Sequence, residues 1–190
     1  MPNEVENFIS NAVTVNDEIQ NTFGGLSNEQ LNWKLNEKEW SIAQCLEHLV
    51  VTNDLYFENI QKVADGTHSN NFYSKVPLAT GLVGWGMKKV LSPDFRPKVK
   101  TLKMFEPAQS QVSANILEDF EKNQKRFVSL MEATEGMDVE RIKIAEPIGA
   151  AVNLKLIDAF EILLVHEKRH FNQAKRVRES DGFPESGENK

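Results

Sequence analysis

The chain has a single cysteine, Cys45, and therefore cannot form an internal disulfide. It has no apolar run near the roughly 20 residues that a membrane-spanning helix needs, and its first residues are acidic, whereas a secretory signal begins with a basic segment. These absences predict a soluble cytoplasmic protein. A surplus of basic residues is also lacking. The net charge of −6 argues against binding to nucleic acid, where neutralisation of phosphates dominates the affinity.

The chain has the composition of a globular protein and a helical periodicity of its apolar residues. Hydrophobic residues make up 40% and charged residues 26%, as in ordinary globular proteins, and this length suits one core. We therefore expect residues 1–190 to form a single domain. Apolar residues recur at three- and four-residue spacing in four long segments, and no two segments suggest a strand pair. The expected architecture is an all-α, antiparallel four-helix bundle.

The four predicted helices end near glycine or proline residues. The second helix has the clearest start, because Ser41 followed by Gln44 fits a capping box, in which each side chain satisfies the backbone N–H of the other residue. The predicted helices cover residues 3–23, 41–65, 108–134 and 153–179.

Residues 66–106 are predicted to form a long irregular excursion between the second and third helices, in which residues 80–91 could form a short helix. The excursion is locally basic: residues 66–105 carry 7 Lys/Arg against 1 Asp/Glu, whereas residues 1–65 carry 3 against 11. These basic residues could guide an anionic substrate, or they could form an ordinary solvated surface. They include Lys88, Lys89, Arg96, Lys98, Lys100 and Lys103.

His166 and His170 lie four residues apart on the fourth predicted helix, so both side chains face the same side. That side carries the apolar stripe of the helix, which directs both imidazoles toward the bundle core. Two imidazoles one turn apart can share a metal ion, although each could also be a hydrogen-bonded core histidine. The chain has four histidines. The better third ligand is His48, on the apolar face of the second helix; the other candidate, His68, lies in a polar turn.

Other interpretations of these motifs stay open or are disfavoured. The segment His166-Glu167-x-x-His170 matches the zincin protease pattern, but the further ligands that zincins need have no counterpart downstream. Glu167 points roughly 100° away from His166 around the helix and is a doubtful general base. Cys45 shares a helix face with His48 and could complete a closed four-ligand site, but free cysteines more often behave as small buried apolar residues.

Each of the two helices that carry these histidines has a recognisable motif. The motifs are Trp40-Ser41-x-x-Gln44-x-x-x-His48-Leu49 and His166-x-x-Arg169-His170-x-x-Gln173. Together they resemble the DinB-like (DinB/YfiT-like) superfamily, over essentially the whole chain. The resemblance implies an up-down-down-up four-helix bundle, often dimeric, with a nickel or zinc site formed by His48, His166 and His170. Characterised members include an isomerase and thiol S-transferases that use bacillithiol, mycothiol or glutathione.

The resemblance and the histidines together favour a metal-dependent enzyme. The leading expectation is a thiol S-transferase that acts on small electrophiles, in which coordination to the metal would ionise a low-molecular-weight thiol. The alternatives are a hydrolase in which the metal ion activates water, and a non-catalytic bundle that binds a metal ion or a small molecule. The expected partners are a small-molecule substrate and a second copy of the chain, with no nucleic acid and no membrane.

Overall fold

The computed structural model describes residues 4–69, 77–95, 97, 101–107 and 111–185. Within these ranges the chain is mostly helical, with one two-stranded sheet. No helix of the described part is long and apolar enough to cross a membrane. The helices are α1 (Glu4–Phe23), α2 (Asn28–Asn32), α3 (Ile42–Ala64), α4 (Pro77–Leu91), α5 (Ile116–Glu132) and α6 (Leu156–Arg178), and η2 (Lys103–Phe105) is a single 3-10 turn.

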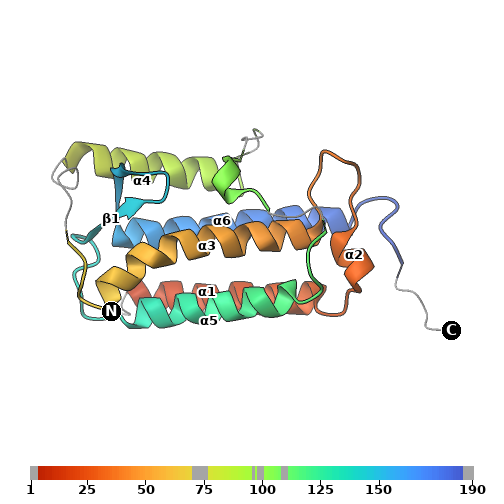
Figure 1. Cartoon of the computed structure of the whole chain (residues 1–190), viewed down its shortest axis with the longest axis horizontal. Helices are drawn as coiled ribbons and strands as arrows, with labels where there is room; N and C mark the ends of the chain where they lie inside the picture. Colours follow the sequence, from red (N-terminus) through yellow and green to blue (C-terminus); the bar gives the residue numbers. More distant parts are fainter. Residues whose placement is uncertain (1–3, 70–76, 96, 98–100, 108–110, 186–190) are drawn as a thin grey trace.

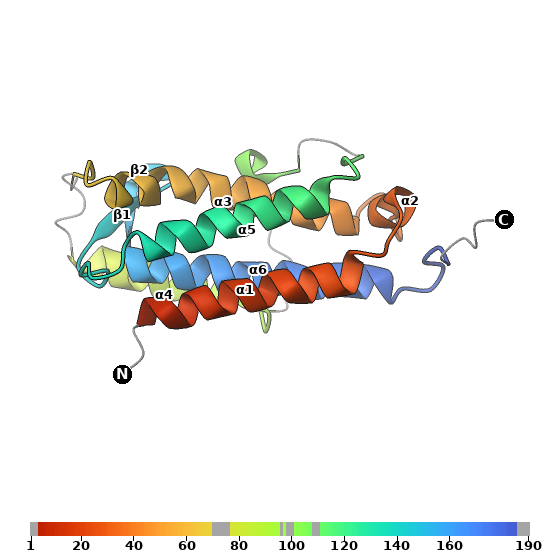
Figure 2. The ribbon, with the colours of Figure 1, turned by 90° about the horizontal axis from the view of Figure 1, so that it is seen from below.

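The long helices α1, α3, α5 and α6 form a four-helix bundle. Helices α3 and α1 each pack against both α5 and α6. Helices α1 and α6 run in one direction along the bundle, and α3 and α5 run in the opposite direction (Figures 1 and 2). Five phenylalanines are completely buried between the helices and supply much of the apolar core: Phe23, Phe57, Phe120, Phe127 and Phe160.

Local signals explain where α3 begins and ends. The Oγ of Ser41 accepts a hydrogen bond from the Gln44 N–H at 3.1 Å, and the Oε1 of Gln44 accepts from the Ser41 N–H at 3.3 Å. This is the capping box that the sequence predicted, and it satisfies two backbone N–H groups that would otherwise lack partners. Gly66, with a φ of 67°, follows the last turn in the left-handed conformation that favours glycine.

A β-hairpin corrects the prediction of a loop between the last two long helices. Strand β1 (Lys143–Glu146) pairs antiparallel with β2 (Gly149–Lys155). Ile144 and Leu154 are paired and buried in the core, which gives the hairpin its inner face. Because β2 continues to Lys155, helix α6 begins at Leu156, whereas residues 153–155 were predicted to be its first turn.

The start of the helix predicted at 108–134 is also wrong. Helix α5 begins at Ile116, and residues 108–110 lie outside the described residues. Ser113 forms a turn just before the helix, in which its carbonyl accepts from the Ile116 N–H at 3.2 Å and its Oγ accepts from the Asn115 N–H at 3.2 Å. A serine that bonds to its own neighbouring backbone competes with the helical pattern.

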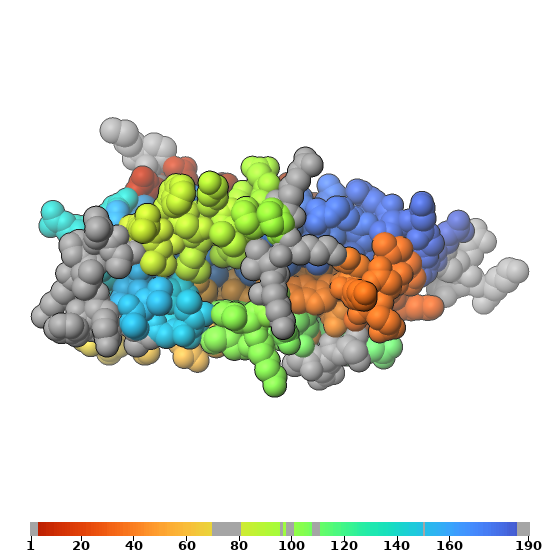
Figure 3. Space-filling view, turned by 90° about the horizontal axis from the view of Figure 1, so that it is seen from above, coloured from red at the N-terminus to blue at the C-terminus, as the bar shows by residue number. Residues whose placement is uncertain are grey.

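The excursion is more regular than the sequence predicted, because α4 covers 15 of its residues. Helix α4 lies outside the bundle and contacts α6 and β2, and Figure 3 shows it beside the hairpin, on the same face as η2. The Nζ of Lys88 binds Asp158 at 3.0 Å and Glu161 at 2.8 Å. Gly84 approaches so closely that a Cβ there would lie 2.8 Å from the Oδ2 of Asp158. A glycine and a salt bridge thus dock α4 against α6.

Candidate metal centre

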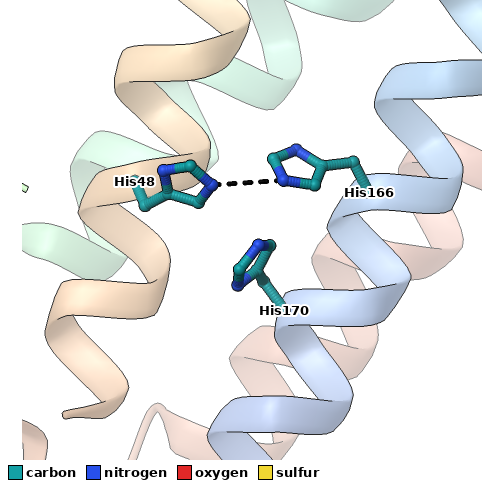
Figure 4. Close-up of side chains that lie close together, drawn as sticks. All are labelled: His48, His166 and His170. Carbon is teal, nitrogen blue, oxygen red and sulfur yellow. Dashed lines mark hydrogen bonds between the residues drawn. The ribbon is translucent and has the colours of Figure 1, made fainter. Parts of the chain in front are cut away.

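The structure brings together three of the four histidines. His48 extends from α3 toward His166 and His170, which lie one turn apart on α6 (Figure 4). One potential ligand atom from each residue lies within 4.8 Å of the other two. The Nε2 atoms of His48 and His166 are 3.1 Å apart. Two nitrogens that bind one zinc ion in tetrahedral geometry are separated by roughly 3.3 Å, so the spacing suits a shared ion.

The ring of His48 is held in one orientation by the backbone of η2. Its Nδ1 lies 2.5 Å from the carbonyl oxygen of Phe105. A carbonyl can only accept a hydrogen bond, so Nδ1 carries the proton and donates it. The Nε2 of His48 then presents a lone pair toward His166. Metal-binding histidines are usually fixed in this way by a partner on the second ring nitrogen.

Burial keeps the three imidazoles neutral. His48, His166 and His170 are 4%, 5% and 8% exposed. Burial lowers the pKa of His48, which its hydrogen bond to Phe105 partly opposes. The pKa values of His166 and His170 fall well below the ordinary value, mainly through burial and secondarily through the neighbouring histidines. Neutral imidazole is the form that binds a metal ion, so the electrostatics also suit such a site.

One nitrogen of the cluster has an unmet bonding capacity. The buried Nδ1 of His170 has no hydrogen-bond partner in the part of the chain that the structure describes. A buried polar atom without a partner destabilises the fold. A metal ion needs only one ring nitrogen of each histidine, and three neutral imidazoles that offer ligand atoms within 4.8 Å of one another fit the ion that the sequence led us to expect.

Trp40 forms one wall of the cluster. Its ring stacks on His170 with a centroid distance of 5.7 Å, and its centroid lies 5.0 Å from that of His48. Trp40 directly precedes the cap residue Ser41, so the start of α3 also places this indole. An aromatic wall excludes water and lowers the local dielectric, which strengthens electrostatic interactions within the site.

The other ligand candidates from the sequence are not part of the cluster. Cys45 is completely buried among apolar residues, and burial raises its thiol pKa to about 12. That environment matches the apolar role that free cysteines usually have. His68 follows the end of α3 in a polar pocket that also contains Lys62 and Lys143. Neither residue belongs to the metal-ligating group in the described part of the chain.

Glu167 is hydrogen-bonded to α3 and α5 and lies outside the three-histidine group in the described part of the chain. Its Oε1 accepts hydrogen bonds from the Nδ2 of Asn53 at 2.8 Å and from the Nε2 of Gln124 at 2.6 Å. Burial raises the pKa of Glu167 to about 7, against the lowering effect of these two hydrogen bonds. The carboxylate is therefore engaged inside the bundle and is poorly placed to act as a base at the cluster.

The basic excursion contributes less free charge near the site than its composition suggested. Lys88 is paired with two carboxylates of α6. Lys103 is exposed, in the same turn as Phe105, and Lys89 lies over the ring of Trp85 at 5.2 Å. Four further cations of the excursion lie outside the described residues: Lys75, Arg96, Lys98 and Lys100. Guidance of an anionic substrate by the excursion stays a prediction. Among these three described lysines, Lys103 is the candidate for that role.

Arg169 makes a contact that the sequence did not predict. Its Nη1 donates to three carbonyl groups at and just beyond the end of α4, at 2.8–3.3 Å: those of Val90, Ser92 and Phe95. Carbonyl groups at a helix end lack partners and carry partial negative charge, which a guanidinium satisfies. Arg169 thus fastens the excursion beside the histidines, and its signal in the sequence was its place in the motif between them.

Comparison with known proteins agrees with this fold. Residues 13–174 match the family profile of the DinB superfamily, and the chain belongs to that superfamily. No curated protein shows a significant sequence match. Among solved structures, the chain is similar to YfiT from Bacillus subtilis, with a TM-score of 0.57 and 13% sequence identity over 95% of this chain and 89% of that chain. YfiT is described as a probable metal-dependent hydrolase with an unusual four-helix bundle topology.

Proposed function

We propose that the protein is a metal-dependent enzyme that acts on a small molecule and holds one divalent ion with His48, His166 and His170. The convergence of three buried neutral imidazoles carries this proposal. Imidazole ligands suit zinc and nickel, and three protein ligands are typical of catalytic sites that keep a position for substrate. A divalent ion bound there would act as a Lewis acid and lower the pKa of a nucleophile that coordinates to it.

The residues around the cluster have separate roles in this proposal. The Phe105 carbonyl holds the Nδ1 proton of His48 and so keeps its Nε2 free to bind. Trp40 shields the imidazoles from solvent. Cys45 has no part in the chemistry, because its thiol is buried and its pKa is raised to about 12. A reacting thiol would therefore have to come from a small molecule.

Transfer of a thiol to a small electrophile is the reaction we favour. No carboxylate joins the histidine group among the described residues, and Glu167 is engaged elsewhere. A thiol has an ordinary pKa of about 8.5 and can ionise on coordination without a protein base. Water is a much weaker acid and profits more from such a base. In such a transfer the sulfur would form a bond to the electrophilic carbon, the leaving group would depart with the electron pair of its bond, and the thiol proton would pass to solvent.

Hydrolysis is the second candidate, and the likeness to YfiT favours it. The two reactions are separated by the same preparation of zinc- or nickel-loaded protein. Turnover of chlorodinitrobenzene that requires bacillithiol, mycothiol or glutathione supports S-transfer, whereas turnover of a nitrophenyl ester without thiol supports hydrolysis. His166→Ala should abolish the metal-dependent rate, and Cys45→Ala should leave it unchanged. Full metal loading without turnover of either class of substrate would contradict an enzymatic role and support a binding protein.

A further inference from the structure

A layer of buried polar side chains divides the apolar core of the bundle. One apolar cluster contains Phe57, Phe127 and Phe160, and the other contains Phe23 and Phe120. Along α3, α5 and α6, residues of the polar layer lie between the residues of these two clusters. The layer consists of Asn53, Asn123, Gln124 and Glu167, which are all at most 5% exposed.

Glu167 is the centre of this layer. Its Oε1 accepts from Asn53 on α3 at 2.8 Å and from Gln124 on α5 at 2.6 Å. The Nδ2 of Asn53 also donates to the Oδ1 of Asn123 at 2.8 Å, and the Nδ2 of Asn123 donates to Asp54 at 3.1 Å. One carboxylate oxygen of α6 is thereby tied to both of the helices that run antiparallel to it.

Stability alone does not account for this layer. Buried polar groups cost free energy that their hydrogen bonds only partly recover, and well-packed apolar residues at such positions are often at least as stable. Directional hydrogen bonds do supply what apolar contacts lack, which is a defined register and rotation of one helix against another. We therefore expect the layer to serve a function that depends on the precise placement of α6.

Alignment of the three histidines requires such placement, because they lie on α3 and α6, two of the helices that the polar layer connects. His166 directly precedes Glu167 on α6, and His48 lies five residues before Asn53 on α3. Successive residues differ by roughly 100° around a helix and 1.5 Å along it. A carboxylate held toward α3 and α5 therefore fixes the direction in which His166 and the following turn project. A slip of one residue would move the imidazoles by more than a ligand distance can tolerate.

We propose that Glu167 is a positioning residue: with Asn53 and Gln124 it sets the rotation and register of α6 against α3, so that His166 and His170 meet His48 at ligand distance. Glu167 is neither a ligand nor a base in this role. The proposal rests on the proposed metal site for its purpose, but the alignment of the three rings is a property of the protein without metal.

The test compares two buried acids that both bind α3. Glu146 is 3% exposed, accepts from the Tyr56 hydroxyl at 2.5 Å and ties β1 to α3. Glu167→Leu and Glu146→Leu therefore remove comparable buried carboxylates, only one of which is next to the histidines. Glu167→Gln keeps an acceptor for Asn53 and Gln124. Gln124→Leu removes one donor and serves where Glu167→Leu does not fold.

Cobalt(II) binding and its visible absorption spectrum report the ligand geometry. Glu167→Leu should weaken cobalt binding by about tenfold or more and change the ligand-field bands, Gln124→Leu should do so to a lesser extent, and Glu167→Gln should restore both. Glu146→Leu should lower the melting temperature without either change. Cobalt binding and spectra that match the wild type in Glu167→Leu and Gln124→Leu, or equal disturbance in Glu146→Leu, would overturn the proposal.

Long-range NMR spectra of the imidazole nitrogens in metal-free protein separate this proposal from the metal proposal. Glu167→Leu and Gln124→Leu should shift the ring signals of His48, His166 and His170, and Glu146→Leu should not. If wild-type protein binds no cobalt while these shifts occur, the proposed function fails and the positioning role of Glu167 holds. Unchanged ring signals in both variants would reject the positioning role, whatever the metal content.

Discussion

A divalent metal ion should raise the melting temperature of this protein through the three-histidine cluster. A ligand that binds the native state alone stabilises it by about 2.7 kcal/mol at 100 times its dissociation constant. In a chain of this size, 1 kcal/mol corresponds to about 2–4 °C, so the expected rise is about 5–10 °C. The unfolded chain should bind the ion much more weakly, because His48 is 118 residues away from His166 in the sequence.

The variant His170→Ala should lose most of this rise without unfolding the bundle. The apolar faces of four helices hold the fold, and His170 contributes one imidazole whose Nδ1 has no partner within the described residues. His68→Ala, which changes a histidine outside the cluster, is the matched control and should keep the wild-type rise. Differential scanning fluorimetry with zinc or nickel, and with a chelator, measures all three proteins. Equal metal-induced shifts in wild type and His170→Ala would show that α6 does not hold the ion.

Three further predictions concern the fold around the site. Cys45 should not react with dithionitrobenzoate in the native protein and should react fully after denaturation, because it is buried and burial raises its pKa to about 12; rapid native labelling would contradict its burial. Ser41→Ala should lower the free energy of unfolding by about 1 kcal/mol in urea titrations, because it removes the cap of α3, and an unchanged midpoint would argue against the capping box. Burial raises the pKa of Glu146 from the ordinary value of 4.5 to about 7 in the native state. Between these two pH values the native state binds one proton more than the unfolded state, so the stability of the wild type falls as the pH rises from 4.5 to 7. Glu146→Gln should therefore gain roughly 3 kcal/mol relative to wild type between pH 4.5 and 7, and a pH-independent difference would count against the raised pKa.

The elements that local signals define were predictable from the sequence. The periodicity of α1, α3 and α6 and the capping box at Ser41 involve residues within a few positions of one another. Helical geometry then placed His48, His166 and His170 on apolar faces, which made His48 the better third candidate, and the structure brings the three residues together. The hairpin was missed because Glu146 occupies an inward position on β1 and breaks the alternation of polar and apolar residues. Its partner Tyr56 is 90 residues away.

The sequence contains a pattern that predicts which residues of the polar layer are buried, but not which residues they bind. Asn53, Gln124 and Glu167 each follow a buried apolar residue by four positions and so continue an apolar stripe; those residues are Leu49, Phe120 and Leu163. A polar residue on such a stripe predicts a buried hydrogen bond, but its partners depend on how three helices pack. The contact of His48 with Phe105 had no signal, because it uses a backbone carbonyl that every residue type possesses.

Metal stoichiometry tests the central claim most directly. Wild-type protein and the variants His48→Ala, His166→Ala and His170→Ala would be dialysed to equilibrium against zinc or nickel, freed of excess metal and measured by elemental analysis. We expect one metal ion per wild-type chain and a large loss of metal in each variant, because each removes one of the three converging imidazoles. Wild-type protein without bound metal, or variants that keep one ion per chain, would contradict a metal centre formed by these three histidines.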